Sequence, residues 1–316
     1  MRRKKNRFIR IALNLILLMA LLKCIPFLST TFSNLGKIES NTDYTVSNHT
    51  LDDNYNSYED IKSRNAAVID KDTNTVIMGK NPQDRIHPAS MTKVMTAIIG
   101  LENAKNLNRR VEITGDIINY CNTNGLSVSG FEEGDKPKVI DLIYGILLES
   151  GGESSIALAR EVSYSEEGFT ELMNKKAMEI GMVNTHFSNS TGITDSENYS
   201  TSQDIALLFD YALKHNKFKK IITAKEYSAY GLKGIFTKHT VYNSLLQKRN
   251  DLNLNKDYIQ GGKTGYTEEA GLCLVSFGTV NGREYIVVTA GADGDSTTPQ
   301  YNLLDSFKLY EELKDY

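Results

Sequence analysis

The order of strand-like and helix-like segments constrains the fold of this chain more than any other feature. Two β-rich runs, Ala66–Asp70 and Thr75–Met78, flank a short polar turn and predict a hairpin. Two more runs, Gly271–Val280 and Glu284–Ala290, flank Asn281-Gly282, a dipeptide typical of hairpin turns. Because the hairpins lie far apart in the chain, we expect one sheet formed by both ends of a domain.

Between the two hairpins, apolar residues recur at helical spacing. The expected helices are Met91–Leu101, Val139–Leu148, Ser155–Val162, Glu171–Ile180 and Ser202–Leu213, with Tyr301–Leu313 after the second hairpin. The middle of the chain therefore predicts a helical insertion between the two parts of the sheet. The sequence shows no internal repeat of the length used by solenoid proteins.

The first residues are typical of an export or anchoring segment. Six basic residues fall within the first ten positions, and the apolar run Ile11–Leu22 follows, interrupted only by Asn14. Extended to Leu28, this run has 18 residues, the lower limit for crossing a bilayer. No A-x-A-like cleavage site follows it, so residues 1–32 are expected to be an uncleaved signal-anchor, with a cleaved signal peptide and a secreted product as the alternative. The basic end should stay cytoplasmic, which places the rest of the chain outside the cell membrane.

Composition separates a linker from a folded domain. Residues 33–64 are rich in Asn, Ser, Thr and Asp and show little apolar periodicity, which predicts a polar linker. Residues 65–316 are expected to form the folded domain. The net charge of the chain is −3, and this near-neutral balance does not indicate a surface that binds nucleic acid.

Several kinds of reactive site are excluded by residue spacing. None of the five histidines forms H-x-x-x-H or lies beside a cysteine at ligand spacing, so no metal site is expected. No serine stands in G-x-S-x-G. A phosphate-binding loop ending at Lys263-Thr264 would need a glycine where Asp257 stands. Cys121 and Cys273 leave two possibilities open: a disulfide in an exported domain, or two reduced and partly buried thiols.

A serine and a lysine three positions apart form the first candidate reactive pair. Ser90 and Lys93 follow Pro88, which suits the first turn of a helix, and the residues after Met91 are apolar. Positions three apart share one helical face, so the amine would lie one turn above the hydroxyl. A lysine accepts a proton only if burial lowers its pKa, and the apolar flank could supply that burial. Ser90 near a helix N-terminus would also place unpaired N–H groups beside an oxyanion.

Two further motifs accompany this pair. Lys263-Thr264-Gly265 opens a β-rich run, and Ser150-Gly151-Gly152 ends an apolar helical run between the other two motifs. In this order the three motifs resemble the penicillin-binding protein and serine β-lactamase superfamily, and more narrowly the low-molecular-weight D-alanyl-D-alanine carboxypeptidases. The resemblance covers residues 65–316. It implies an α+β fold of the β-lactamase/transpeptidase type, an α/β sandwich in which helices cover an antiparallel sheet of about five strands.

The resemblance also implies a role for each motif. Ser90 would be the acylated nucleophile, Lys93 its general base, and Ser150 a proton relay to the leaving amine. Lys263 and Thr264 would hold the terminal carboxylate of a peptide.

The same resemblance defines the rest of the substrate-binding surface. The backbone N–H groups of Ser90 and Tyr266 would form an oxyanion hole. Gly265 and Gly152 are the remaining residues of the expected substrate-binding surface. No cofactor is implied.

Two departures from the family pattern concern substrate holding. The middle motif usually ends in Asn, but here it ends in Gly152, and asparagine at this position is expected to improve catalysis unless a neighbouring side chain fills the same space. The family also commonly carries an arginine after the last hairpin, whereas this chain has no basic residue between Arg283 and Lys308. The family's C-terminal β-rich domain and membrane helix have no counterpart in this sequence, which leaves the N-terminal segment as the expected anchor.

The function implied is a membrane-anchored serine D,D-carboxypeptidase that removes the terminal D-Ala from peptidoglycan stem peptides and is inhibited by β-lactams. A D,D-endopeptidase would use the same residues. A β-lactamase would need a second carboxylate to activate water, and Glu171 fits an ordinary amphipathic helix better than that role. A catalytically impaired protein that binds wall peptide is the non-enzymatic alternative.

Overall fold

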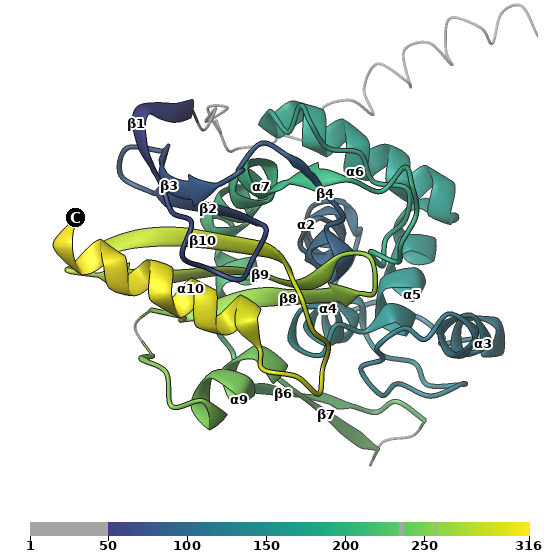
Figure 1. Cartoon of the computed structure of the whole chain (residues 1–316). Helices are drawn as coiled ribbons and strands as arrows, with labels where there is room; N and C mark the ends of the chain where they lie inside the picture. Colours follow the sequence, from purple (N-terminus) through teal and green to yellow (C-terminus); the bar gives the residue numbers. More distant parts are fainter. Residues whose placement is uncertain (1–49, 234–236, 257) are drawn as a thin grey trace, which may run out of the picture. The chain divides into compact units, whose positions relative to one another are not determined.

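Two hairpins from opposite ends of the chain form the central sheet (Figure 1). The structure is a computed structural model that describes residues 50–233, 237–256 and 258–316. In sheet order the strands are β1 (Thr50–Ser57), β3 (Thr75–Lys80), β2 (Asn65–Asp70), β10 (Arg283–Ala292), β9 (Gly271–Val280) and β8 (Gly261–Thr267). Neighbouring strands are antiparallel except β1 and β3, which are parallel.

The sheet is closed by pairing between the first and the last hairpin. Asp70 of β2 pairs with Tyr285 of β10, and the register continues to Asn65 opposite Ala290. Strands β9 and β10 are buried along almost their whole length, which explains their nearly uninterrupted apolar sequences. The expected sheet formed by both ends of the domain is confirmed, with six strands in place of about five.

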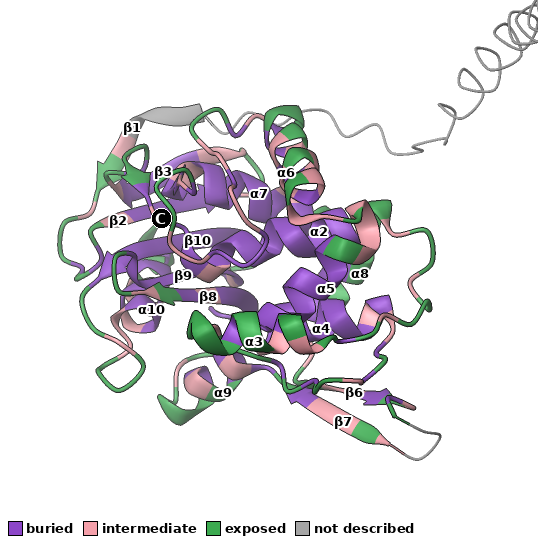
Figure 2. Ribbon diagram, turned by 90° about the vertical axis from the view of Figure 1, so that its right-hand side faces the viewer, coloured by how far each residue is buried: buried purple, intermediate pink, exposed green. Residues whose placement is uncertain are grey.

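Helices cover both faces of this sheet. Those of the insertion are α2 (Lys93–Asn103), α3 (Gly115–Thr123), α4 (Val139–Leu148), α5 (Gly152–Ser163), α6 (Glu166–Ile180), α7 (Ser202–Lys214) and α8 (Asn216–Ile222). The larger apolar core lies between these helices and one face of the sheet, where α7 packs on β2 and β10. On the other face, α10 (Tyr301–Glu312) covers β9 and β10 over a smaller core and ends in the short helix η2 (Leu313–Asp315). Figure 2 shows the buried residues concentrated in α2, α4 and the central strands.

Smaller elements lie at the margins of the domain. Strands β4 (Arg85–Ile86) and β5 (Ser200–Thr201) pair with each other, as do β6 (Glu226–Tyr230) and β7 (Lys238–Tyr242). Helix α9 (Ser244–Asp251) follows β7 and leads toward β8. Their short lengths and polar compositions give no helical or alternating pattern, so the sequence did not predict them.

The N-terminal boundary of the fold differs from the expected one. Part of the expected linker, residues 33–64, is strand β1, which extends the sheet beyond β3. Backbone hydrogen bonds to an edge strand hold such a segment in the sheet, although its sequence is polar. The expected anchor, residues 1–32, lies outside the described residues. Within the described ranges, no helix is both long and apolar enough to span a bilayer.

The two cysteines of the folded domain are reduced. Both Cys121 and Cys273 are free and buried. Of the two possibilities left open by the sequence, the structure shows the pair of buried thiols. Burial raises the pKa of each thiol to about 11, so both behave as small apolar side chains at neutral pH.

Candidate active site

Ser90 lies on a short 3-10 turn between the sheet and the first helix of the insertion. The turn, η1 (Ala89–Thr92), begins after Pro88 and is closed by a hydrogen bond from Met91 N to Pro88 O. Ala89 has a φ of +46°, a backbone conformation that an L-residue adopts only when its surroundings hold it there. This turn presents the Ser90 hydroxyl to an open groove, while the side chain of Met91 points into the core.

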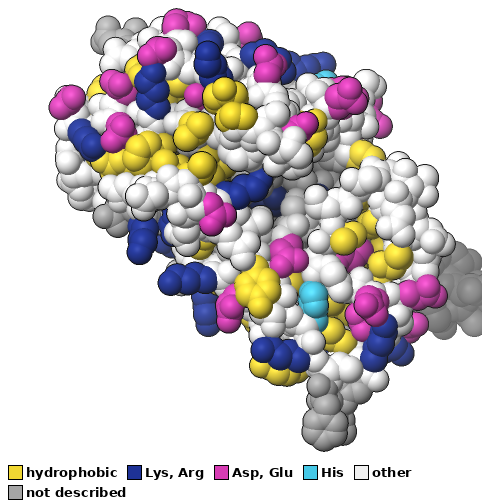
Figure 3. Space-filling view, turned by 60° about the horizontal axis from the view of Figure 1, so that its bottom comes forward, with side chains coloured by type: hydrophobic (Ala, Val, Ile, Leu, Met, Phe, Trp, Pro, Cys, Tyr) yellow, Lys and Arg dark blue, Asp and Glu magenta, His cyan; other side chains and the backbone are white. Residues whose placement is uncertain are grey.

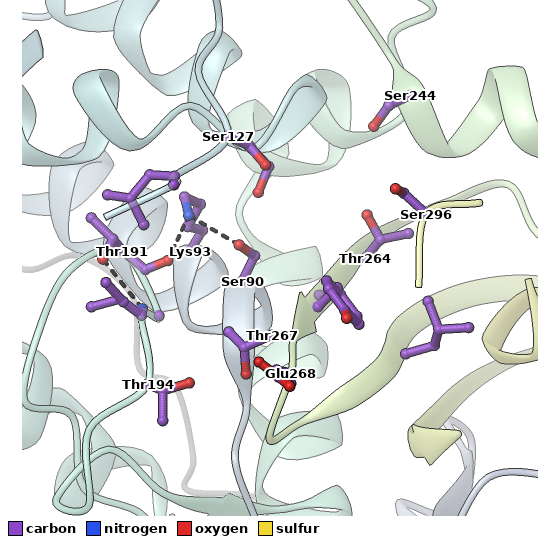
Figure 4. A pocket seen from close by; sticks show the side chains of 18 of the residues that line it. Ser90, Lys93, Ser127, Thr191, Thr194, Ser244, Thr264, Thr267, Glu268 and Ser296 are labelled. Carbon is purple, nitrogen blue, oxygen red and sulfur yellow. Dashed lines mark hydrogen bonds between the residues drawn. The ribbon is translucent and has the colours of Figure 1, made fainter. Parts of the chain in front are cut away.

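Lys93 occupies the first position of α2 directly beside Ser90 (Figure 4). Its Nζ lies 3.0 Å from Ser90 Oγ and 2.5 Å from the carbonyl oxygen of Thr191. Only 1% of the Lys93 side chain is exposed. Burial lowers the pKa of Lys93 to about 8, although the negative charge of Glu153 opposes this change. An amine with such a pKa is partly neutral near physiological pH and can accept the proton of an adjacent hydroxyl.

A loop between α6 and β5 supplies the carbonyl that holds Lys93. The side chain of Asn189 organises this loop: its Oδ1 accepts hydrogen bonds from the N–H groups of Thr191 and Gly192. Its Nδ2 donates to Ile193 O at 3.1 Å. Gly192 is required here, since a Cβ would stand 2.0 Å from Ala89 O and its φ is +79°. The loop therefore fixes both the amine of Lys93 and the turn that carries Ser90.

Strand β8 borders the groove on the opposite side, where Thr264 and Gly265 line it and Lys263 precedes them in the strand. Lys263 is buried, and its Nζ lies 3.0 Å from Ser150 Oγ and 2.7 Å from Thr264 O. Burial, aided by repulsion from Lys93 and Lys248, holds the pKa of Lys263 well below its usual value. The structure thus brings the serine of the second motif into contact with the lysine of the third.

Gly265 permits β8 to approach the turn that carries Ser90. A Cβ at this position would stand 3.1 Å from both Ala89 Cβ and Ser90 N. The two neighbours would therefore have to move by a few tenths of an ångström to accept any side chain. Tyr266, the next residue, lines the groove and its side chain is exposed.

Gly152 lies at the start of α5, away from open space. Its N–H donates to Ser127 O at 2.7 Å, and it is buried. A Cβ would meet Leu126 Cβ at 3.0 Å, Leu126 Cδ1 at 3.1 Å and Ser127 O at 3.1 Å. Leu126 therefore fills the space that a side chain at position 152 would need, which is the alternative that the sequence left open.

The groove itself is a cavity of about 680 Å³ between β8, the Ser90 turn, α9 and several loops. Ser90, Lys93, Ser150, Thr264 and Tyr266 all line it. Figure 4 shows Ser244 and Ser296 on the same side as Thr264, and Glu268 beside Thr267. Buried Lys263 and Gly152 lie behind this lining.

Several lining residues were not found from the sequence. They are Leu126, Thr191, Glu149, Lys248 and Gln300, which reach the groove from five different segments. Apart from Glu149, which directly precedes Ser150, none adjoins one of the three motifs, and only the folded chain brings them together. Among the described residues, no cluster of His, Cys, Asp or Glu has the arrangement of a metal site.

Comparison with known proteins gives consistent results. Residues 52–294 match the model of the peptidase S11 family, described as D-alanyl-D-alanine carboxypeptidase. The chain is 32% identical over 257 residues to D-alanyl-D-alanine carboxypeptidase DacF of Bacillus subtilis, covering 79% of this chain and 63% of that protein. It is 29% identical over 240 residues to a D-alanyl-D-alanine endopeptidase of Pseudomonas aeruginosa, covering 76% of this chain and 74% of that protein.

A solved structure agrees with this family in fold. The crystal structure of the Streptomyces K15 DD-transpeptidase superposes with a TM-score of 0.72 and 27% identity, covering 81% of this chain and 98% of that one. The α+β fold expected from the three motifs is therefore confirmed.

Proposed function

The chain belongs to the peptidase S11 family of D-alanyl-D-alanine carboxypeptidases, and on that premise we propose that it removes the terminal D-Ala from peptidoglycan stem peptides. The reaction proceeds through an acyl-enzyme on Ser90. The observation that carries this proposal is the amine of buried Lys93 at 3.0 Å from Ser90 Oγ. A buried lysine with a lowered pKa can act as a general base, whereas a lysine on the surface stays protonated at neutral pH.

Acylation begins with proton transfer from the Ser90 hydroxyl to Lys93 Nζ. The Ser90 oxygen then bonds to the carbonyl carbon of the penultimate D-Ala, and the oxyanion is stabilised by the backbone N–H groups of Ser90 and Tyr266. The C–N bond breaks as the departing amine takes a proton from Ser150 Oγ, which Lys263 contacts at 3.0 Å. The proton held by Lys93 passes to Ser150, so the hydroxyl is restored and Lys93 is again neutral. Water next attacks the ester carbonyl and passes a proton to neutral Lys93, which gives it to Ser90 Oγ as the ester C–O bond breaks and the shortened peptide leaves.

The carboxylate of the departing D-Ala lies, in this proposal, against Lys263 and Thr264. Lys263 is buried among positive charges, so an incoming carboxylate would offset the repulsion that lowers its pKa. The Thr264 side chain lines the groove and can donate a hydrogen bond to the same group. The site therefore favours a peptide with a free C-terminus.

We also propose that this domain works outside the cell membrane. The support is the basic cluster and apolar run within residues 1–32, followed by a polar segment before β1. The stem peptides of peptidoglycan lie on that side of the membrane. A cleaved signal and a secreted enzyme are the alternative.

Acylation by penicillin tests the proposed function directly. The full chain, incubated with penicillin, should gain the mass of one penicilloyl group on a peptide that contains Ser90. Ser90→Ala should abolish the adduct, while Ser127→Ala, a change elsewhere in the groove lining, should retain it. An adduct that persists in Ser90→Ala would show that another residue is the nucleophile.

The rival activities differ in their products. A D,D-endopeptidase would cleave cross-linked muropeptide dimers faster than it releases D-Ala from monomers. A β-lactamase would turn over penicillin rapidly, but Glu171 is exposed on α6 and does not line the groove. A wall-peptide-binding protein without activity would bind the peptide and show neither product nor adduct.

A further inference from the structure

The groove lacks the cation that this family places after its last hairpin. Between Arg283 and Lys308 the sequence has no basic residue, and the segment that borders the groove there is polar and acidic. Ser296, Gln300 and Asn302 line the groove from this segment. Lys263 is buried and already contacts Ser150 Oγ and Thr264 O. A second positive charge for a substrate carboxylate must therefore come from another element.

Helix α9 supplies such a charge at Lys248. This residue lies on the last turn of the helix, and its side chain lines the groove. Helix α9 packs against β8, and Lys248 lines the same groove as Thr264, the neighbour of Lys263. The positive charge of Lys248 contributes to the lowered pKa of Lys263. The face brought forward in Figure 3 is hollowed near its centre, with basic side chains at the edge of the hollow.

Gln300 holds the ammonium group of Lys248 in place. Lys248 Nζ donates to Gln300 Oε1 at 2.7 Å. The amide of Gln300 is itself fixed, because its Nε2 donates to Asp295 O and Thr298 O, both at 2.9 Å. Its oxygen is thereby turned toward Lys248. The segment after β10, which has no basic residue of its own, thus positions the lysine of α9.

The charge of Lys248 is not neutralised by its neighbours. In the described part of the chain its side chain forms no ion pair, and its one hydrogen-bond partner is a neutral amide. Burial lowers the pKa of Lys248, as expected for a partly desolvated cation without a carboxylate. Of the acidic residues that line the groove, Glu149 accepts from Tyr242 N and Glu269 from Thr194 Oγ1.

We infer that Lys248, positioned by Gln300, binds the C-terminal carboxylate of the substrate together with Lys263 and Thr264. This inference rests on the proposed function, since it assigns the carboxylate of a D-Ala-D-Ala peptide to this end of the groove. Lys248 is a substrate-binding residue with no part in proton transfer. From its position on α9, Lys248 supplies the positive charge that the arginine after the last hairpin supplies in the family.

Binding to a protein that cannot react tests this assignment. In a Ser90→Ala background, calorimetry measures the dissociation constants of a tripeptide ending in D-Ala-D-Ala and of the same peptide with a C-terminal amide. Lys248→Met keeps the apolar stem and removes the charge, so carboxylate peptide should bind roughly tenfold more weakly. Binding of the amide should not change. Lys248→Arg should retain most of the preference, and Gln300→Glu should reduce it by pairing with the lysine.

A control variant shows whether the effect is specific to Lys248, and separate measurements distinguish this inference from the proposed function. Lys220→Met removes one exposed charge on α8, outside the groove, and should change neither constant. A preference for the carboxylate that survives Lys248→Met, or falls equally in Lys220→Met, would overturn the inference. Failure of the wild-type chain to release D-Ala or to form a penicilloyl adduct would overturn the proposed function alone, because the binding constants do not depend on turnover.

Discussion

At the scale of single residues, three lysines lie in the groove or directly behind its lining, in three different settings. Lys93 is buried and contacts a hydroxyl and a carbonyl, which suits a base. Lys263 is buried beside Ser150 and near other cations, which suits the binding of an anion. Lys248 is half-buried against an amide at the edge of the groove. The position of each amine, and not its residue type, decides what it can do.

The pH dependence of acylation should follow Lys93. Below its pKa of about 8 the amine carries a proton and cannot accept another from Ser90, so the rate should fall as the pH drops. Above that value the rate should reach a plateau. Stopped-flow measurement of penicillin acylation at a series of pH values checks this. Lys93→Arg should be nearly inactive at every pH, because guanidinium does not deprotonate in proteins. A rate that is flat through pH 8 would exclude lysine as the base.

Gly152→Asn should lower activity. A side chain at this position meets Leu126 and Ser127 O at about 3 Å, and overpacking of this kind typically costs about 1–3 kcal/mol. Thermal unfolding should show the loss of stability, and release of D-Ala should slow with it. Leu126→Ala in the same protein should recover part of both, because it opens the space that the amide needs. Higher kcat/KM in Gly152→Asn alone would mean that Leu126 moves aside easily.

The sequence identified the residues with short-range patterns and missed those without one. Ser90 with Lys93, Ser150 with Gly152, and Lys263 with its neighbours stand in fixed spacings. The structure brings these three motifs to one groove. Leu126 and Gln300 reach it only through the tertiary fold, since each belongs to a loop or a helix end with no repeating pattern. Contacts of this kind depend on the packing of distant segments, which local sequence patterns do not reveal.

At the scale of elements, long amphipathic helices and apolar strands were predicted well. The bounds of α4 and β9 agree with the sequence prediction, because an apolar helical period marks α4 and an apolar run that ends at Asn281-Gly282 marks β9. The start of α2 was placed two residues early, since η1 precedes it with a different hydrogen-bond pattern. Strand β1 and helix α9 were missed because their sequences are mainly polar and the rest of the fold holds them. Local pattern thus predicts the elements that form the core.

The spacing between β8 and the Ser90 turn depends on Gly265. In Gly265→Ala the new methyl group stands 3.1 Å from Ala89 Cβ and Ser90 N, so the strand and the turn must separate slightly. Small displacements of reacting groups have large kinetic effects, and we expect acylation by penicillin to slow roughly tenfold or more. Gly168→Ala, in the first turn of α6 and outside the groove, is the control and should leave the rate unchanged. Wild-type kinetics in Gly265→Ala would show that the strand yields without disturbing the nucleophile.

At the scale of the whole molecule, the sheet joins the two ends of the domain. Pairing of β2 with β10 means that the first and last hairpins stabilise each other. The helical insertion carries Ser90 and Ser150, while β8 carries Lys263. The groove therefore lies where the insertion meets the edge of the sheet, and it depends on both being folded.

The N-terminal segment should determine where this domain works. If Ile11–Leu28 anchors the chain, the full-length protein should stay in the membrane fraction after an alkaline carbonate wash. Leu15→Lys with Leu18→Lys places two charges in the middle of the apolar run, each costing about 2.5–3.5 kcal/mol at the centre of a bilayer, and should release the protein or block its export. Quantitative blotting of the two fractions gives the measurement. Retention of wild-type protein in the soluble fraction, shortened at its N-terminus, would instead establish a cleaved signal. The groove residues all lie beyond position 89, so either result leaves the chemistry of the site unchanged and decides only how closely it is held to the membrane.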